Sequence, residues 1–294
     1  MRRLLLLGLA VCLALGGCDS SPGPDSDPSS SPRPDDPTVR EYVALGDSYT
    51  SGPGIEPLSE KAAPCQRSTV DYPALIARRL DAQLTDVSCG SATTPDVLSQ
   101  PQTTAQVQVP QINAVTREAD LVTVGIGAND GFATPLFLQC LFGRAPEKTC
   151  PTFVEEEVPA RLSHIETAVG EILAEVRRHA PEATIVLVGY MSLASGGQRC
   201  KELPVSDEVL TTMHRAEQQL EQTLAAAAEQ HRAVFVPMGR LSKGHDPCAD
   251  KPWTNGIKAS PGNGEFLHPR KAGMVATADA IVDAVRDARS DAED

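Results

Sequence analysis

Short apolar segments that alternate with amphipathic helical segments restrict the fold of this chain more than any other feature. The segments with an almost continuous apolar character are residues 42–45, 121–126, 184–189 and 233–236. The helical patterns between and after them are residues 71–84, 154–179, 206–230 and 271–289. Strands that are apolar on both faces and are separated by helices indicate a parallel sheet covered on both sides. We therefore expect an α/β fold, a three-layer α/β/α sandwich with a central parallel sheet.

Four segments have a weaker pattern. Residues 107–119 are expected to be helical after Pro110, and residues 85–88 to form a short strand. Residues 131–153 and 238–268 are long, contain Gly, Pro and Cys, and are expected to be functional loops.

The first apolar strand ends in a turn that carries a hydroxyl group. Residues 43–52 read VALGDSYTSG, so Ser48 follows the strand by a few residues. Ligands bind at the carboxyl ends of the strands in α/β sheets, which places Ser48 beside a crevice. Ser48 is therefore a candidate nucleophile, with a helix-capping serine as the alternative. Asp47 and Asp130 are expected to hold turns.

The charge of the chain argues against nucleic acid as a partner. The formal net charge is −13, whereas binding to phosphates requires a basic surface. Without Arg2 and Arg3, 39 acidic residues stand against 24 basic ones, a charge of −15. A surface of anionic lipid would repel this domain at long range.

The amino-terminal residues have the pattern of an export signal. Two arginines precede an apolar run over residues 4–15, which is too short to span a bilayer. The run ends in LGGC, so residues 1–17 are expected to be a lipoprotein signal peptide and Cys18 the lipidated residue. A plain signal peptide with an incidental cysteine is the alternative. Residues 18–38 contain mainly Pro, Ser and Asp and are expected to be a disordered tether to a domain over residues 39–294.

Six cysteines remain in the exported domain: Cys65, Cys89, Cys140, Cys150, Cys200 and Cys248. An even number in an exported chain predicts disulfides, although the sequence alone does not select their pairing. A metal site is the other interpretation, but the spacings are wide and no CxxC pair occurs.

Four separate motifs together resemble the blocks of the SGNH (GDSL-type) hydrolases. They are GDSYTSG at residues 46–52, Gly90, GAND at residues 127–130 and EFLHP at residues 265–269. Their order and spacing match over roughly residues 40–288, nearly the whole mature chain. The resemblance implies that Ser48 is the nucleophile and His268 the base. It also implies an oxyanion hole made by the Ser48 N–H, the Gly90 N–H and the Asn129 amide. It further implies disulfides in chain order, namely Cys65–Cys89, Cys140–Cys150 and Cys200–Cys248.

The group that would orient His268 departs from the pattern of this family. Glu265 stands three residues before His268, where most members have Asp. Glu265 is the expected acid, and the alternative is the carbonyl of Phe266, a backbone group that some actinobacterial relatives use. His245 is a second candidate for the base, although its place beside Cys248 favours a structural role.

The resemblance implies a serine esterase or lipase that acts on lipid or fatty-acyl esters through an acyl-serine intermediate. No metal or organic cofactor is implied, and the expected partners are a small ester or lipid substrate and, through Cys18, a membrane. The protein is expected to be an extracytoplasmic monomer, either anchored to the membrane or secreted. The alternatives are a polysaccharide deacetylase of the same fold and a surface lipoprotein that binds without catalysis.

Overall fold

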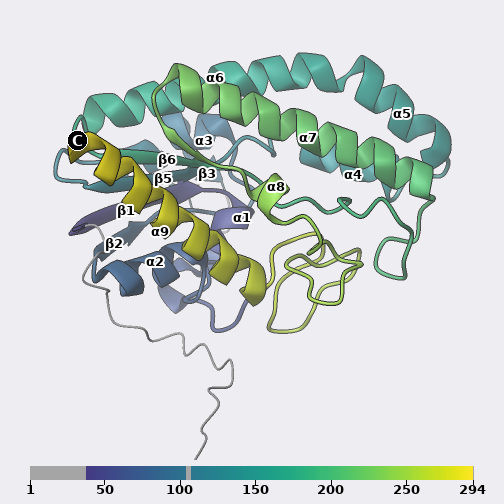
Figure 1. Ribbon diagram of the computed structural model, residues 1–294, viewed down its shortest axis with the longest axis horizontal. Coiled ribbons are helices and arrows are strands. Elements are labelled where there is room, and N and C mark those ends of the chain that lie inside the picture. Colours follow the sequence, from purple (N-terminus) through teal and green to yellow (C-terminus); the bar gives the residue numbers. More distant parts are fainter. Residues whose placement is uncertain (1–37, 104–106, 294) are drawn as a thin grey trace, which may run out of the picture. The chain divides into compact units, whose positions relative to one another are not determined.

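The computed structural model describes residues 38–103 and 107–293 (Figure 1). The expected signal peptide, the lipidated Cys18 and all but the last residue of the expected tether lie outside this part of the chain.

Five strands form one parallel sheet. They are β1 (Glu41–Gly46), β2 (Gln83–Asp86), β5 (Leu121–Gly125), β6 (Thr184–Val188) and β7 (Val234–Val236). Their order is β2-β1-β5-β6-β7, and every neighbouring pair is parallel. The order reverses between β1 and β5, and such a switch point opens a crevice at the carboxyl ends of the strands. Ser48 follows β1 and Asn129 follows β5, so the topology brings both residues to this crevice.

Strand β1 shows why these segments are apolar throughout. Side chains alternate between the two faces of a strand. Val43 and Leu45 belong to one buried cluster, and Tyr42 and Ala44 belong to another cluster. Since neither face of the sheet meets water, an alternation of polar and apolar residues would leave polar groups buried.

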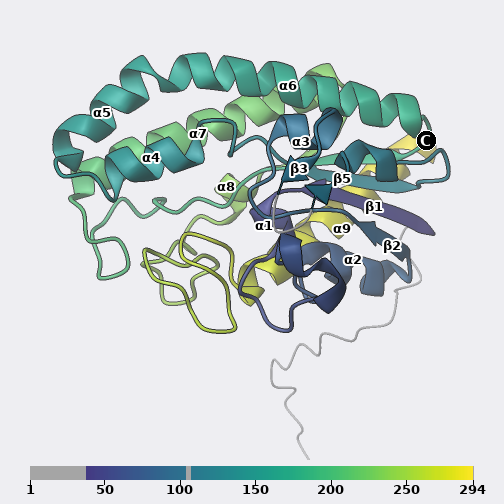
Figure 2. The same ribbon diagram turned by 180° about the vertical axis from the view of Figure 1, so that it is seen from behind.

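Helices cover both faces of the sheet (Figures 1 and 2). Helices α2 (Tyr72–Leu80) and α9 (Lys271–Glu293) pack together on one face, through residues such as Ile76 and Ile281. Helices α3 (Thr94–Leu98), α6 (Val158–His179) and α7 (Asp207–Gln230) pack over the other face, and α6 and α7 contact each other along their length. The α/β fold with a central parallel sheet and flanking helices is confirmed.

Several of the expected segments differ from the structure. The helix expected over residues 71–84 ends at Leu80, and residues 83–86 form β2, which begins earlier than the strand expected over 85–88. Residues 131–153 form helices rather than a long loop, namely α4 (Ala133–Cys140) and most of α5 (Pro146–Glu156). The helix expected over 154–179 is interrupted between α5 and α6, where Pro159 occupies the start of α6 and has no N–H to continue the previous helix. The disulfide Cys140–Cys150 joins α4 to α5, and α5 packs against α7.

The expected helix over residues 107–119 is also absent. In its place are the short strand β4 (Val107–Gln108), paired with β3 (Gln102–Thr103), and the 3₁₀ turn η2 (Gln111–Ala114). The buried Gln111 side chain accepts from the Gly46 N–H at 2.8 Å and donates to the Gly46 carbonyl at 3.0 Å. This contact requires a turn rather than a helix at Gln111, a constraint that no local pattern reveals. The remaining short elements are α1 (Ser48–Ser51), η1 (Glu60–Cys65) and α8 (Met238–Leu241).

The disulfides Cys65–Cys89 and Cys200–Cys248 complete the chain-order pairing that the family resemblance implies. Within residues 38–103 and 107–293, no helix has both the length and the apolar character needed to cross a bilayer. The same residues contain no group of three or more His, Cys, Asp or Glu side chains placed to hold a metal ion.

Candidate active site

Ser48 lies in a tightly constrained turn after β1. The Asp47 carboxylate accepts from the Tyr49 N–H at 2.8 Å and so caps the short helix α1, in which Ser48 is the first residue. A Cβ on Gly46 would lie 2.1 Å from Thr50 Oγ1, so only glycine fits at that position. The turn therefore holds the Ser48 hydroxyl at the carboxyl edge of the sheet.

His268 meets Ser48 across 220 residues of sequence. Its Nε2 atom lies 2.8 Å from Ser48 Oγ, and its Nδ1 atom lies 2.7 Å from the carbonyl oxygen of Phe266. A carbonyl can only accept, so Nδ1 carries the hydrogen and Nε2 is free to take the proton of the serine. Burial lowers the pKa of His268 below its usual 6.5, although the Phe266 contact and the charge of Glu265 oppose this shift. A neutral imidazole is the form that a general base requires.

The hydrogen bonds of the structure favour the Phe266 carbonyl, which the sequence left as the alternative, over Glu265 as the group that orients the imidazole. The Nδ1 atom is bonded to the Phe266 carbonyl, and the Glu265 carboxylate lies beside Gly54 instead. Two hydrogen bonds hold the Glu265 backbone. Its N–H donates to the Pro53 carbonyl, and its own carbonyl accepts from Asn255 Nδ2 at 3.0 Å. The arrangement is a Ser–His dyad with a backbone carbonyl in the place of the acid.

The turn that presents the Phe266 carbonyl depends on Leu267. Leu267 has a φ of 57°, a left-handed conformation that costs a non-glycine residue about 1–3 kcal/mol. The Leu267 side chain is buried, its N–H donates to the Gly256 carbonyl at 2.8 Å, and its own carbonyl accepts from the Tyr49 hydroxyl at 2.8 Å. These contacts hold the conformation and link the histidine loop to the residue next to Ser48.

The Gly90 N–H does not face the site as expected. It donates to the Cys65 carbonyl at 3.1 Å and is therefore not available to an oxyanion. The next residue, Ser91, lines the catalytic pocket and has a φ of 65°. Within the described part of the chain, neither the Ser91 N–H nor the Ser48 N–H has a hydrogen-bond partner. A left-handed φ normally indicates glycine, but in the CGSA sequence of residues 89–92 the glycine stands one residue before the left-handed position, which is Ser91. The sequence therefore points to Gly90 instead of Ser91.

Asn129 also lines the pocket, as its place after β5 predicts. One hydrogen of its amide is donated to the Ala92 carbonyl at 3.0 Å, which fixes the side chain and leaves the second hydrogen. The neighbouring Asp130 carboxylate accepts from the N–H and the hydroxyl of Thr94, so its role is to hold the turn.

Tyr190 connects the two catalytic turns and was not singled out from the sequence. Its hydroxyl donates to the Asp47 carboxylate at 2.6 Å and accepts from the Ala128 N–H at 3.1 Å. Asp47 precedes Ser48 and Ala128 precedes Asn129, so one hydroxyl sets the spacing of both turns. Burial raises the pKa of Asp47 to about 7, and the Tyr190 hydrogen bond opposes the shift. A single Tyr after β6 has no sequence signal that would distinguish it from a core residue.

His245, the second candidate base, lies outside the catalytic pocket. Its Nδ1 atom bonds to the Lys251 carbonyl at 2.8 Å and its ring stacks on Trp253. Of the histidines in the described ranges, only His268 lines the pocket that contains Ser48.

The pocket around Ser48 and His268 has a volume of about 400 Å³. Apart from the catalytic groups, its walls are largely apolar and come from α4, the segment after it and the histidine loop: Ala133, Phe137, Leu138, Phe142, Phe266 and Leu267. Leu138, Phe142 and Phe266 remain 53%, 47% and 47% exposed. Such a cluster of exposed apolar side chains around a polar centre is typical of a binding site for an apolar ligand.

The dyad predicts a small effect of Glu265→Gln. Because the imidazole is held by a carbonyl rather than by this carboxylate, kcat/KM should stay within about threefold of the wild type, well short of the loss of about 10⁴ seen when a triad acid is removed. Steady-state ester hydrolysis at a pH above the pKa of His268 is the measurement. A loss of a hundredfold or more with an unchanged melting temperature would restore Glu265 as the acid.

Tyr190→Phe should lower kcat more than it raises KM. The change leaves the Ala128 N–H and a buried Asp47 oxygen without a partner, which costs about 1–3 kcal/mol of folding stability and loosens both catalytic turns. Tyr42→Phe is the matched control, since the buried Tyr42 hydroxyl bonds to Thr123 at 2.9 Å away from the pocket. Equal kcat values in the two variants, at similar losses of stability, would contradict a positioning role for Tyr190.

Comparisons with known proteins agree with this site. The model of the GDSL-like lipase/acylhydrolase family matches residues 44–276. Lipase 2 of Streptomyces coelicolor is 32% identical over 88% of this chain and 88% of its own length. Two solved structures are similar. Phospholipase A1 of Streptomyces albidoflavus has a TM-score of 0.66 and 26% identity, and the match covers 83% of this chain and 98% of that one. An extracellular lipase of Streptomyces rimosus has a TM-score of 0.65 and 27% identity, and the match covers 83% of this chain and 99% of that one. The chain belongs to the GDSL-like lipase/acylhydrolase family.

Proposed function

We propose that this protein is a serine hydrolase that cleaves carboxylic esters of lipids through an acyl-Ser48 intermediate. The observation that carries the proposal is the 2.8 Å contact between His268 Nε2 and Ser48 Oγ at the floor of an apolar pocket. The lipase and phospholipase A1 relatives support a lipid ester as the substrate.

The catalytic cycle follows from the positions of the hydrogens. Ser48 Oγ attacks the ester carbonyl while its proton moves to His268 Nε2, and the Phe266 carbonyl stabilises the imidazolium through Nδ1. The protonated His268 then donates to the leaving alcohol. A water activated by the same nitrogen cleaves the acyl-serine and regenerates the enzyme.

We infer that the developing oxyanion is bound by the N–H groups of Ser48 and Ser91 and by the free amide hydrogen of Asn129. Ser91 takes the place that the sequence suggested for Gly90, since the Gly90 N–H is occupied by Cys65. Removal of one donor of this kind typically costs about 3–4 kcal/mol of transition-state stabilisation.

The alternatives have less support. A polysaccharide deacetylase is less favoured, because the relatives are a lipase and a phospholipase A1. A protein that binds without catalysis would not need the aligned Ser48 and His268.

We further propose that the protein is an extracytoplasmic monomer attached to a membrane by a lipidated Cys18. The three disulfides and the extracellular lipase relative support export. The LGGC sequence supports the lipid, with residues 18–38 as the tether. One chain supplies the whole catalytic set, which supports a monomer.

Hydrolysis of p-nitrophenyl esters of increasing acyl length tests the proposed activity. Turnover should rise beyond acetate, because the pocket walls are apolar, and Ser48→Ala should abolish it without lowering the melting temperature. Activity confined to acetate would favour the deacetylase, and no activity at any length would favour a binding protein.

Mass spectrometry of the mature amino terminus tests the anchor. The expected species begins at Cys18 and carries added acyl groups, and Cys18→Ser should release the protein into the medium. A mature chain that begins at another residue without modification would contradict the anchor and leave the proposed enzyme activity untouched.

A further inference from the structure

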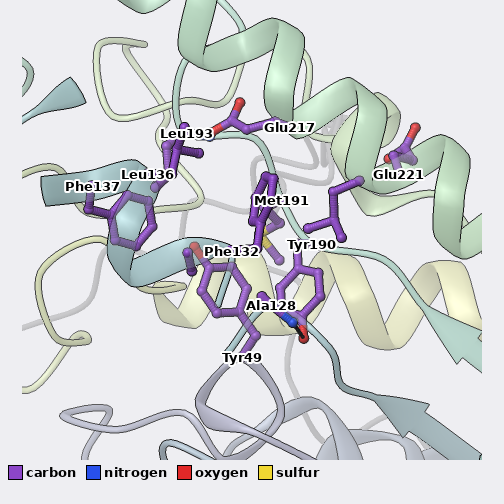
Figure 3. Close-up of a pocket in the computed structure, with 12 residues that line it drawn as sticks. Tyr49, Ala128, Phe132, Leu136, Phe137, Tyr190, Met191, Leu193, Glu217 and Glu221 are labelled. Carbon is purple, nitrogen blue, oxygen red and sulfur yellow. Dashed lines mark hydrogen bonds between the residues drawn. The ribbon is translucent and has the colours of Figure 1, made fainter. Parts of the chain in front are cut away.

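A second, smaller cavity lies directly behind the catalytic pocket, between α4 and α7. Figure 3 shows the side chains that surround it. Its volume is about 40 Å³. The apolar residues that line only this cavity are Phe132, Leu136, Met191, Leu193 and Leu220, and the residues that line both cavities are Tyr49, Ala128, Ala133, Phe137 and Tyr190. We call this smaller cavity the inner chamber.

The inner chamber is suited to hydrocarbon rather than to water. A space of about 10–15 Å³ is enough for one water-sized group, so the chamber holds on the order of three methylene or methyl groups. Most of its lining residues are apolar, and burial of a hydrocarbon group against them removes that group from water.

The inner chamber and the catalytic pocket share part of their lining. Ala128 and Ala133 contribute little volume to it. The Tyr190 ring is fixed by the two hydrogen bonds of its hydroxyl, whereas the half-buried Phe137 ring has no polar group to hold it. Passage between the two spaces past the Phe137 ring therefore breaks no side-chain hydrogen bond.

Two carboxylates, Glu217 and Glu221, line the inner chamber beside its apolar residues. Glu217 accepts from the N–H groups of Leu193 at 2.9 Å and Ala194 at 3.3 Å, and Glu221 accepts from the Arg240 N–H at 2.9 Å. Both glutamates also border a polar surface cavity on their other side. A hydrocarbon chain that passed them would desolvate these charges, so the chamber ends there.

We propose that the inner chamber binds the terminal carbons of the acyl chain and thereby sets the preferred acyl length. The inference rests on the proposed esterase function. His268 protonates the leaving alcohol, so the alcohol lies beside the histidine loop, and residues 266–268 do not contribute to the lining of the chamber. Ala128 does contribute, and it precedes Asn129, whose amide is proposed to hold the acyl carbonyl oxygen.

Filling the inner chamber tests the proposal. Leu220→Phe in the mature protein should lower kcat/KM for octanoyl and longer p-nitrophenyl esters by tenfold or more, since each excluded methylene is worth about fourfold. Hydrolysis of the acetyl ester should change little. Leu241→Phe is the matched control, because Leu241 is 43% exposed and lines neither cavity. Leu136→Ala, which enlarges the chamber, should move the preference towards longer acyl chains.

A second ester series shows whether the acyl group or the alcohol of the substrate enters the inner chamber. Alkyl acetates vary the alcohol while the acyl group stays constant. The dependence of kcat/KM on the length of the alcohol should be the same in Leu220→Phe and in the wild type. The proposal is overturned if a folded Leu220→Phe keeps the wild-type acyl profile, or if it alters the alcohol series instead. Should Leu220→Phe fail to fold, Leu193→Phe makes the same test. A wild-type protein without activity on any ester would instead overturn the proposed function.

Discussion

The hydrogen bond from His268 Nδ1 to the Phe266 carbonyl is the interaction on which the site depends. It fixes the imidazole so that Nε2 faces Ser48, and it needs the chain to reverse at Leu267. A left-handed leucine is unfavourable in isolation. Burial of its side chain and the hydrogen bonds of its N–H and carbonyl offset that cost, so the catalytic geometry is maintained by packing around the loop rather than by a charged acid.

Buried polar side chains hold the other loops in the same manner. Gln111 pairs with both backbone groups of Gly46 before the nucleophile, and Tyr190 joins the turns of Ser48 and Asn129. Asn255 donates to the carbonyls of Gly264 and Glu265 in the loop that leads to His268. Gln111 and Tyr190 each make two hydrogen bonds to segments distant in sequence, whereas Asn255 bonds to residues nine and ten positions away in its own loop. Such contacts specify the loop geometry more precisely than apolar packing does.

The sequence predicted the sheet, its helical layers and the turns that carry Ser48 and His268, because apolar strands and the motifs at their carboxyl ends leave strong local patterns. It did not predict the roles of Tyr190 and Ser91 or the helices over 131–153. Tyr190 contacts two turns that are distant in sequence. Ser91 has a left-handed φ, which cannot be inferred from a serine in the sequence. Glu265 was expected at Nδ1 because it lies near the base in sequence, and the structure has at that place the Phe266 carbonyl, which the sequence left as the alternative.

The tautomer of His268 tests the dyad most directly. Nitrogen-15 NMR of the resting enzyme, above the pKa of His268, distinguishes a ring nitrogen that carries hydrogen from one that does not, and His268→Gln assigns the signals. The dyad predicts the hydrogen on Nδ1, donated to the Phe266 carbonyl, and a bare Nε2 facing Ser48. A neutral ring with its hydrogen on Nε2 would contradict this account, because such a ring could not accept the serine proton.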